Sequence, residues 1–236
     1  MDVLHEGLAR LGMDNPALAE KMDAYIRTLQ AYNAKFNLVS TDGYDDIAVR
    51  HILDSLSGAA VIRTLLEKRI AAGVPRDEIV LADIGSGAGL PGIPLAAAFS
   101  DVSFVLVERM TKRADFLRHC AATLGLQNVS VEENQAERLA QRRFDIAAFR
   151  AFRPLEKKMT KVLLRILKDG GYLAAYKAKR EKIIAEMDAL PAVPAYEIVP
   201  LTVPFLTQCA ADADERERNM VVISCPRQSA SAVLSG

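Results

Sequence analysis

The sequence predicts an α/β fold with a mostly parallel, doubly wound sheet of seven strands and an N-terminal helical cap. Two observations predict this class. Seven short apolar or β-branched runs follow residue 78, and stretches with helical spacing separate most of them. The first 74 residues show helical spacing only. We therefore expect a cap over residues 1–74, a core over 75–228 and a short tail over 229–236.

The cap is expected to form helices over 1–11, 17–36 and 44–68. In the second of these, apolar residues recur at spacings of three and four, and Asn15 before Pro16 is typical of a helix start. Ser57-Gly58 interrupts the third. These signals predict an amphipathic helical layer rather than a further sheet.

The core is expected to alternate strands and helices. The expected strands are 79–84, 103–108, 129–132, 144–149, 171–176, 196–203 and 219–225. The expected helices are 93–99, 113–124, 136–142, 155–167 and 180–190. The last two strands are joined only by residues 204–218, where Asp212, Asp214 and Glu215 form no helical stripe. A hairpin with one antiparallel strand fits that short link.

A glycine loop follows the first strand and precedes a helix. Gly85, Gly87 and Gly89 alternate after Asp83. Such a loop lets the backbone approach a ligand beside the free N–H groups of a helix start. A phosphate-binding P-loop would need lysine here, and the dinucleotide fingerprint would need glycine where Leu90 stands. The pattern Asp-x-Gly-x-Gly-x-Gly resembles the first motif of Rossmann-like class I S-adenosylmethionine (SAM) methyltransferases.

Glu108 closes the second expected strand, about twenty residues after the glycines. An acid at that position can accept hydrogen bonds from both ribose hydroxyls of a nucleoside. The alternative is a solvated acid at a strand end, but the spacing from the loop favours the ribose.

Composition narrows the class of protein further. The chain has 236 residues, 50% of them hydrophobic and 25% charged, which is ordinary for a globular protein. It has neither an apolar run of about 18–20 residues nor a basic start before an apolar block, so we expect no membrane span and no signal peptide. Three scattered cysteines and three scattered histidines predict no disulfide framework and no metal site. We expect a cytoplasmic protein with reduced thiols, and a monomer.

The net charge of zero hides an asymmetry. Residues 138–182 hold fourteen Lys or Arg against four acids, whereas the first sixty residues hold nine acids against five bases. A basic stretch in a neutral chain is expected of a protein that meets phosphate on one face. For any single lysine, a solvated helix surface is the competing explanation.

Several motifs together resemble one family, RsmG (also called GidB). They are Asn37-Leu38, His51-Ile52-Leu53-Asp54-Ser55-Leu56, Asp83 to Leu95, Lys112-Arg113 with Phe116-Leu117, Phe144-Asp145, Arg150-Ala151 and Glu217-Arg218. The resemblance covers roughly residues 25–225. It implies a SAM-dependent methyltransferase that modifies N7 of one guanosine in bacterial 16S ribosomal RNA.

The resemblance also implies positions for the cofactor. It places Gly85 and Leu90 on SAM, Ala136 and Glu137 against the adenine, and Arg150 near the methionine end or the target. The chain departs from the family pattern at three positions. It has Gln135 where Arg is usual, Phe149 where Ser is usual, and Ala178 where Gly is usual.

The chemistry requires no general base, because guanine N7 has a free lone pair and no proton. We therefore assign no residue to proton transfer and expect catalysis by positioning. Asp83 is expected to bond the loop backbone or the methionine amine, and Gly87 completes the cofactor loop. The candidates for RNA contact are His51, Lys112, Arg113 and Lys177. A helix-surface histidine bonded to Asp54 is the competing interpretation of His51.

Three other functions share these features. A dinucleotide oxidoreductase would use the same strand, loop and acid, but Leu90 speaks against it. A small-molecule methyltransferase leaves the basic run unexplained. A non-catalytic RNA-binding protein would have no need of intact glycines and Glu108.

Overall fold

The computed structural model describes residues 2–192, 194–209 and 216–226. It contains one seven-stranded sheet in the order β3-β2-β1-β4-β5-β7-β6. The strands are β1 (Val80–Ile84), β2 (Ser103–Glu108), β3 (Val129–Glu133), β4 (Phe144–Arg150), β5 (Leu167–Lys177), β6 (Tyr196–Leu201) and β7 (Arg218–Ser224). All neighbouring pairs are parallel except those made by β7, which runs antiparallel to β5 and β6. The predicted mostly parallel sheet with one reversed strand is confirmed.

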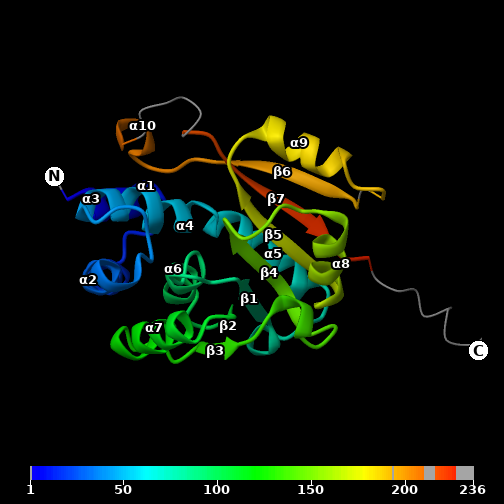
Figure 1. Ribbon diagram of the computed structural model, residues 1–236, viewed down its shortest axis with the longest axis horizontal. Coiled ribbons are helices and arrows are strands. Elements are labelled where there is room, and N and C mark those ends of the chain that lie inside the picture. Colours follow the sequence, from blue (N-terminus) through cyan, green and yellow to red (C-terminus); the bar gives the residue numbers. More distant parts are fainter. Residues whose placement is uncertain (1, 193, 210–215, 227–236) are drawn as a thin grey trace, which may run out of the picture.

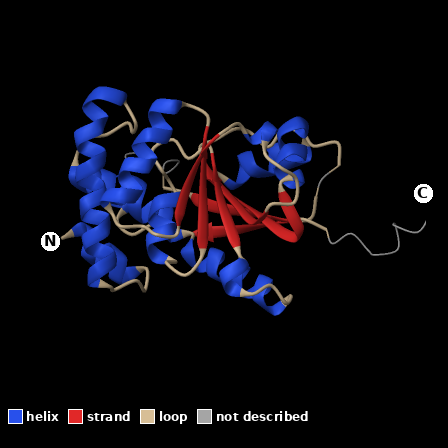
Figure 2. Ribbon diagram, turned by 90° about the horizontal axis from the view of Figure 1, so that it is seen from below, coloured by secondary structure: helices blue, strands red, loops and turns tan. Residues whose placement is uncertain are grey.

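Helices cover both faces of the sheet (Figure 2). The N-terminal helices are α1 (Val3–Arg10), α2 (Pro16–Phe36), α3 (Tyr44–Ile47), the π-helical turn η1 (Ala48–Leu53), α4 (Asp54–Ser57) and α5 (Ala59–Ala71). The later ones are η2 (Arg76–Glu78), α6 (Gly92–Ala98), α7 (Thr111–Thr123), η3 (Ala136–Arg138), α8 (Lys157–Arg165), α9 (Arg180–Asp188) and α10 (Leu206–Cys209). Figure 1 shows α1, α2 and α3 gathered at one end, beside α6 and α7, while α5 lies behind the strands.

The central strands are buried on both faces, which explains their continuous apolar runs. Alternate residues point to opposite sides. Phe104 and Leu106 join the core that contains the N-terminal helices, α6 and α7, whereas Val105 and Val107 join the core beneath α8 and α9. The N-terminal helices therefore share one hydrophobic core with a face of the sheet. The predicted boundary between the helical cap and the core at residue 74 stays a prediction.

Some sequence expectations were wrong in detail. The helix predicted over 136–142 is only the short 3-10 turn η3, because Ala136 and Leu139 already reach the core at the three-residue spacing of such a turn. The link between β6 and β7 contains the short helix α10, which was not expected. The acidic residues of that link, Asp212, Asp214 and Glu215, and the predicted tail lie outside the described residues.

Candidate active site at the carboxyl edge of the sheet

Two cavities lie where the parallel strands end. The smaller, about 290 Å³, is lined by Ile84, Gly85, Val107, Glu108, Arg109, Arg113, Asn134, Gln135, Ala136, Glu137, Ala151, Phe152 and Arg153. The larger, about 580 Å³, is lined by His51, Asp54, Phe149, Arg150, Ala151, Phe152, Arg153, Pro154, Tyr176, Lys177, Ala178 and Arg218. Ala151, Phe152 and Arg153 line both, so the two cavities meet at the segment that follows β4.

The glycine loop is held open by its neighbours. Gly85 and Gly87 have φ of 72° and 55°, values that favour glycine. The Gly85 N–H donates to the Val107 carbonyl at 2.9 Å, and the Gly87 N–H donates to Glu108 Oε2 at 3.0 Å. From the cap, the buried Tyr25 hydroxyl donates to the Ala88 carbonyl. The loop is thus fixed from both β2 and α2.

Glu108, at the end of β2, both fixes the glycine loop and lines the smaller cavity. Its side chain is buried, and its Oε1 accepts the Met110 N–H at 2.9 Å while Oε2 accepts from Gly87. A carboxylate has about four lone-pair sites, so two remain for other donors. Because Glu108 lines the smaller cavity, it fits the ribose hydroxyls of a nucleoside there. Ala136 and Glu137 lie in the wall of the same cavity, as the adenine assignment requires.

Asp83 and Leu90 do not line either cavity. Asp83 is fully buried, and its Oδ2 accepts the Gly92 N–H at 3.0 Å, which ties β1 to the start of α6. Burial raises the pKa of Asp83 to about 7, and Oδ1 has no hydrogen-bond partner among the described residues. Leu90 packs in the hydrophobic core. The backbone contact of Asp83 is thus to Gly92, just beyond the glycine loop, and the contact expected with the methionine amine stays a prediction. Asp83 and Leu90 both lie behind the loop.

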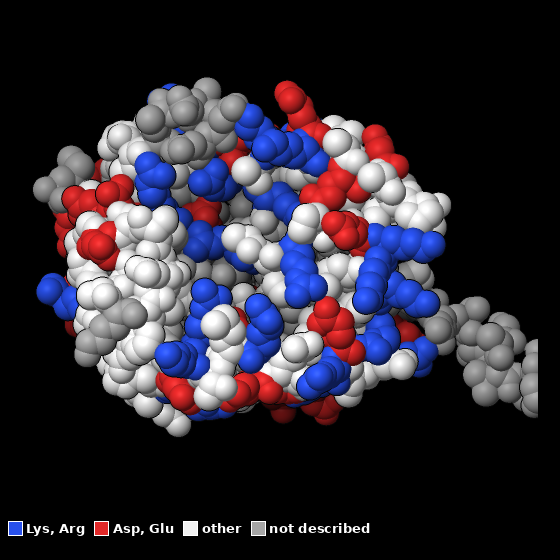
Figure 3. All heavy atoms as spheres, in the orientation of Figure 1, with Lys and Arg blue, Asp and Glu red and all other residues white. Residues whose placement is uncertain are grey.

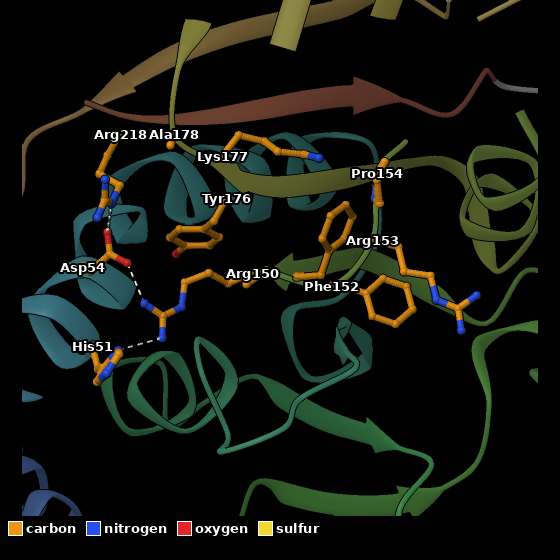
Figure 4. Close-up of a pocket in the computed structure, with 12 residues that line it drawn as sticks. His51, Asp54, Arg150, Phe152, Arg153, Pro154, Tyr176, Lys177, Ala178 and Arg218 are labelled. Atoms are coloured by element: carbon orange, nitrogen blue, oxygen red, sulfur yellow. Dashed lines mark hydrogen bonds and ion pairs between the residues drawn. The ribbon is translucent and has the colours of Figure 1, made fainter. Parts of the chain in front are cut away.

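Arg150 is the centre of the larger cavity (Figure 4). Its Nη1 donates to Asp54 Oδ2 at 2.6 Å and to the Arg50 carbonyl at 3.0 Å. Its Nη2 lies 3.3 Å from His51 Nδ1. Asp54 also accepts Arg218 Nε at 3.0 Å through its other oxygen. One buried carboxylate from the cap therefore holds two arginines from β4 and β7.

His51 is neutral in this setting. Burial and the neighbouring Arg150 charge lower the pKa of His51 to about 4. Because Nδ1 faces an arginine donor, the ring proton belongs on Nε2. His51 orients Arg150 in the structure and lines the larger cavity, so the RNA contact expected for it stays a prediction.

The other RNA candidates are dispersed. Lys177 ends β5 in the larger cavity and forms an ion pair with Glu186 at 2.8 Å. Arg113 lies in the smaller cavity, and Lys112 is exposed on the first turn of α7 outside both. Of the three departures from the family pattern, Gln135 lines the smaller cavity, whereas Phe149 and Ala178 line the larger.

Among the residues of the larger cavity, Asp54, Phe152, Tyr176 and Arg218 were assigned no function from the sequence. Asp54 and Arg218 stood inside motifs that carried the family resemblance, so a signal for them was present. Phe152 and Tyr176 had no distinguishing spacing. Tyr176 is buried and donates its hydroxyl to the Ser55 carbonyl at 2.6 Å, a second tie between cap and sheet.

Within the described part of the chain, no group of three or more His, Cys, Asp or Glu is placed to hold a metal ion. No helix among the same residues is both long and apolar enough to span a bilayer. Cys120, Cys209 and Cys225 are free thiols.

Comparison with known proteins places these features in context. The profile of the family described as rRNA small subunit methyltransferase G matches residues 18–211. The ribosomal RNA small subunit methyltransferase G of Treponema denticola is 35% identical, with 95% of this chain and 94% of that protein covered. The protein of the same name from Stenotrophomonas maltophilia is 35% identical, with 94% of each covered.

Two solved structures share the fold at low sequence identity. The [4+2]-cyclase SpnF has a TM-score of 0.55 at 13% identity, covering 89% of this chain and 95% of that chain. The tRNA (m1A58) methyltransferase TrmI from Aquifex aeolicus has a TM-score of 0.52 at 12% identity, covering 73% and 69%. These likenesses extend to the fold alone.

Proposed function

This chain belongs to the rRNA small subunit methyltransferase G family, and on that premise we propose that it methylates N7 of one guanosine in 16S ribosomal RNA. The family predicted from the sequence motifs is confirmed, and the chain is a SAM-dependent rRNA methyltransferase. The observation that carries the proposal is the pair of cavities that meet at the end of β4. A methyltransferase needs two such sites, one for the methyl donor and one for the base.

The smaller cavity suits the nucleoside of SAM. Glu108 presents spare lone pairs for the ribose, and Ala136 with Glu137 forms the wall proposed for the adenine. Gly85 lines the smaller cavity, and its backbone contacts Phe152 at the junction of the two cavities, where the methionine end would lie. SAM supplies a methyl group on a positively charged sulfur.

The larger cavity suits the target base. It is roomier, it adjoins the junction, and its wall carries the cations Arg150, Arg218 and Lys177, which pair with Asp54 and Glu186. Asp54 and His51 fix the Arg150 guanidinium before any ligand arrives. An arginine held in this way loses less conformational freedom on binding than a free one.

No residue in either cavity has to remove a proton. The N7 lone pair of guanine is free for attack, and in-line positioning of two reactants can supply roughly 7–11 kcal/mol in favourable cases. In agreement with this, His51 is neutral and its Nδ1 faces Arg150, so His51 is not placed to act as a base. The proposed catalysis is therefore orientation and electrostatics.

The charge around the site supports an RNA substrate. Six Arg or Lys line the two cavities against three acids. Figure 3 shows blue side chains around the central hollow. Outside the cavities, Lys168 of the basic run pairs with Asp145 at 2.7 Å and Arg143 pairs with Glu132. The 16S substrate implies a cytoplasmic enzyme, and both cavities come from one chain, in keeping with a monomer.

The proposal is tested by transfer of tritiated methyl from SAM to 16S rRNA, naked and in small-subunit particles, that lacks the modification. We expect incorporation into 16S rRNA and none into 23S rRNA. Gly85→Ala should abolish SAM binding and transfer, because φ there is 72° and a Cβ would collide with Phe152. Gly12→Ala is the matched control, with φ of 70° but open space around it and no cavity nearby. A wild-type protein that takes up no SAM would contradict the proposal.

A further inference from the structure

Phe152 stands at the junction of the two cavities. It lies two residues beyond β4 and lines both of them. Ala151 before it has φ of 50°, in the left-handed region that residues other than glycine seldom adopt. Figure 4 shows Arg150 extending toward Asp54 and His51, while the Phe152 ring lies on the other side of the end of β4. The backbone turn at Ala151 thus presents the ring to the cavities.

The Phe152 ring contacts the glycine loop. A Cβ on Gly85 would collide with its Cδ2 and Cε2 atoms, so ring and loop backbone are in contact. Phe149 meets the ring edge-to-face with centroids 5.9 Å apart and planes at 62°. The side chain is half-buried and packs against the core beneath α8 and α9. An aromatic face is therefore held in place beside the first glycine of the loop.

We propose that the Phe152 ring contacts the charged sulfur of SAM and the target base, and stabilises the positive charge as it moves between them. The inference rests on the proposed function, because it needs the nucleoside in the smaller cavity and the base in the larger. An aromatic face attracts a cation through its quadrupole, and more strongly when water is excluded. Phe152 is then a catalytic residue that transfers no proton.

The electron balance of the reaction explains why the junction matters. The N7 lone pair forms the new C–N bond, the C–S bond breaks, and its electron pair stays on sulfur. The sulfur becomes a neutral thioether and the base becomes cationic. A side chain that borders both cavities lies next to the positive charge on sulfur before the transfer and next to the positive charge on the base after it.

The other shared residues do not offer this stabilisation. Ala151 has no charge or π-face. Arg153 is itself a cation: it pairs with Glu137 at 3.3 Å, and its guanidinium carbon lies 5.6 Å from the centre of the Phe152 ring. The Asp54 carboxylate is engaged by Arg150 and Arg218. Of the three residues common to both cavities, only Phe152 can stabilise a cation.

Calorimetry with SAM and with S-adenosylhomocysteine tests the inference without RNA. The two ligands differ only at sulfur, where SAM has the methyl group and the positive charge and S-adenosylhomocysteine has neither. Phe152→Leu keeps apolar bulk and removes the π-face. A contact worth about 1 kcal/mol corresponds to about fivefold in Kd. We expect Phe152→Leu to weaken SAM about fivefold more than S-adenosylhomocysteine, whereas Phe152→Tyr keeps the wild-type ratio.

Two controls make the result decisive. Phe36→Leu removes an exposed phenylalanine of α2 outside both cavities and should change neither affinity. Ring-fluorinated phenylalanines at position 152 keep the shape and withdraw π density, so SAM affinity should fall stepwise with fluorine number. Equal losses for both ligands in Phe152→Leu, or a flat fluorine series, overturn the inference. A wild-type protein that binds neither ligand overturns the proposed function instead.

Discussion

Asp54 illustrates at the scale of one residue how the site is assembled. It lies in α4, with its side chain 5% exposed, and it bonds arginines that are 96 and 164 positions away in sequence. The family resemblance identified Arg150, yet nothing in the sequence brings residues 54, 150 and 218 together. The glycine loop and Glu108 were predictable because their spacing is local. The larger cavity was not, because it is made by tertiary contacts.

Asp54→Asn should lower single-turnover methyl transfer about 100-fold while leaving the Kd for SAM unchanged. The substitution keeps size but removes the charge that orients Arg150 and Arg218, and misplacement of about 1 Å can cost that much in rate. SAM binding is spared because Asp54 does not line the smaller cavity. Asp115→Asn is the control, since its pair with Arg118 at 2.7 Å is exposed on α7. A transfer rate within twofold of wild type would contradict the orienting function.

His51 should make the fold sensitive to mild acid. Its pKa is lowered to about 4 by burial and Arg150, against about 6.5 in the unfolded chain. The unfolded state therefore binds the proton first, so stability is full above pH 6.5 and falls as the pH drops toward 4. At pH 5 the loss is about 2 kcal/mol. Urea unfolding at pH 7.5 and 5.0 should show this extra loss in the wild type and not in His51→Gln, and equal losses would disprove it.

At the scale of elements, the sequence predicted types well and irregularities poorly. The strand β2 has the predicted bounds, because a buried parallel strand has an unbroken apolar run. The strand β5 begins at Leu167 rather than 171, and its pairing with β4 shifts register between Phe144 and Ile146. The turn η1 is π-helical where an ordinary helix was expected, and it carries His51 to Arg150. Apolar periodicity does not encode such local departures.

Asp145 joins three elements at the opposite edge of the sheet. Its Oδ1 accepts Arg69 Nη2 at 2.7 Å, and its Oδ2 accepts Lys168 Nζ at 2.7 Å and the Val80 N–H at 3.0 Å. Asp145→Ala leaves a buried guanidinium without its anion, so we expect a loss of roughly 3–5 kcal/mol in unfolding free energy. Urea denaturation measures it.

A double variant distinguishes the contribution of the ion pair to stability from that of side-chain packing. Arg69→Met with Asp145→Leu removes both charges, and buried pairs exchanged for apolar residues are often neutral in stability. We expect the double variant to recover part of the loss, because Lys168 and the Val80 N–H still lose their acceptor. The exposed pair Arg118–Asp115 should contribute less than about 1 kcal/mol when cut. A single variant that is no less stable than this control would refute the buried network.

At the scale of the whole molecule, the N-terminal helices build part of the candidate active site. They supply His51 and Asp54 to the larger cavity, and Tyr25 to the glycine loop. The sheet supplies the smaller cavity and the strand ends. The predicted helical cap therefore contributes side chains to the candidate site, which composition and periodicity had no means to indicate.

The position of the transferred methyl group tests the central claim most directly. After incubation with SAM, 16S rRNA is reduced with borohydride and treated with aniline, which cleaves the chain at N7-methylguanosine. We predict cleavage at a single guanosine, absent without SAM and absent with Gly85→Ala. Methyl incorporation without such a cut, or methyl found on another atom of the RNA, would contradict the assignment of the two cavities to SAM and guanine N7.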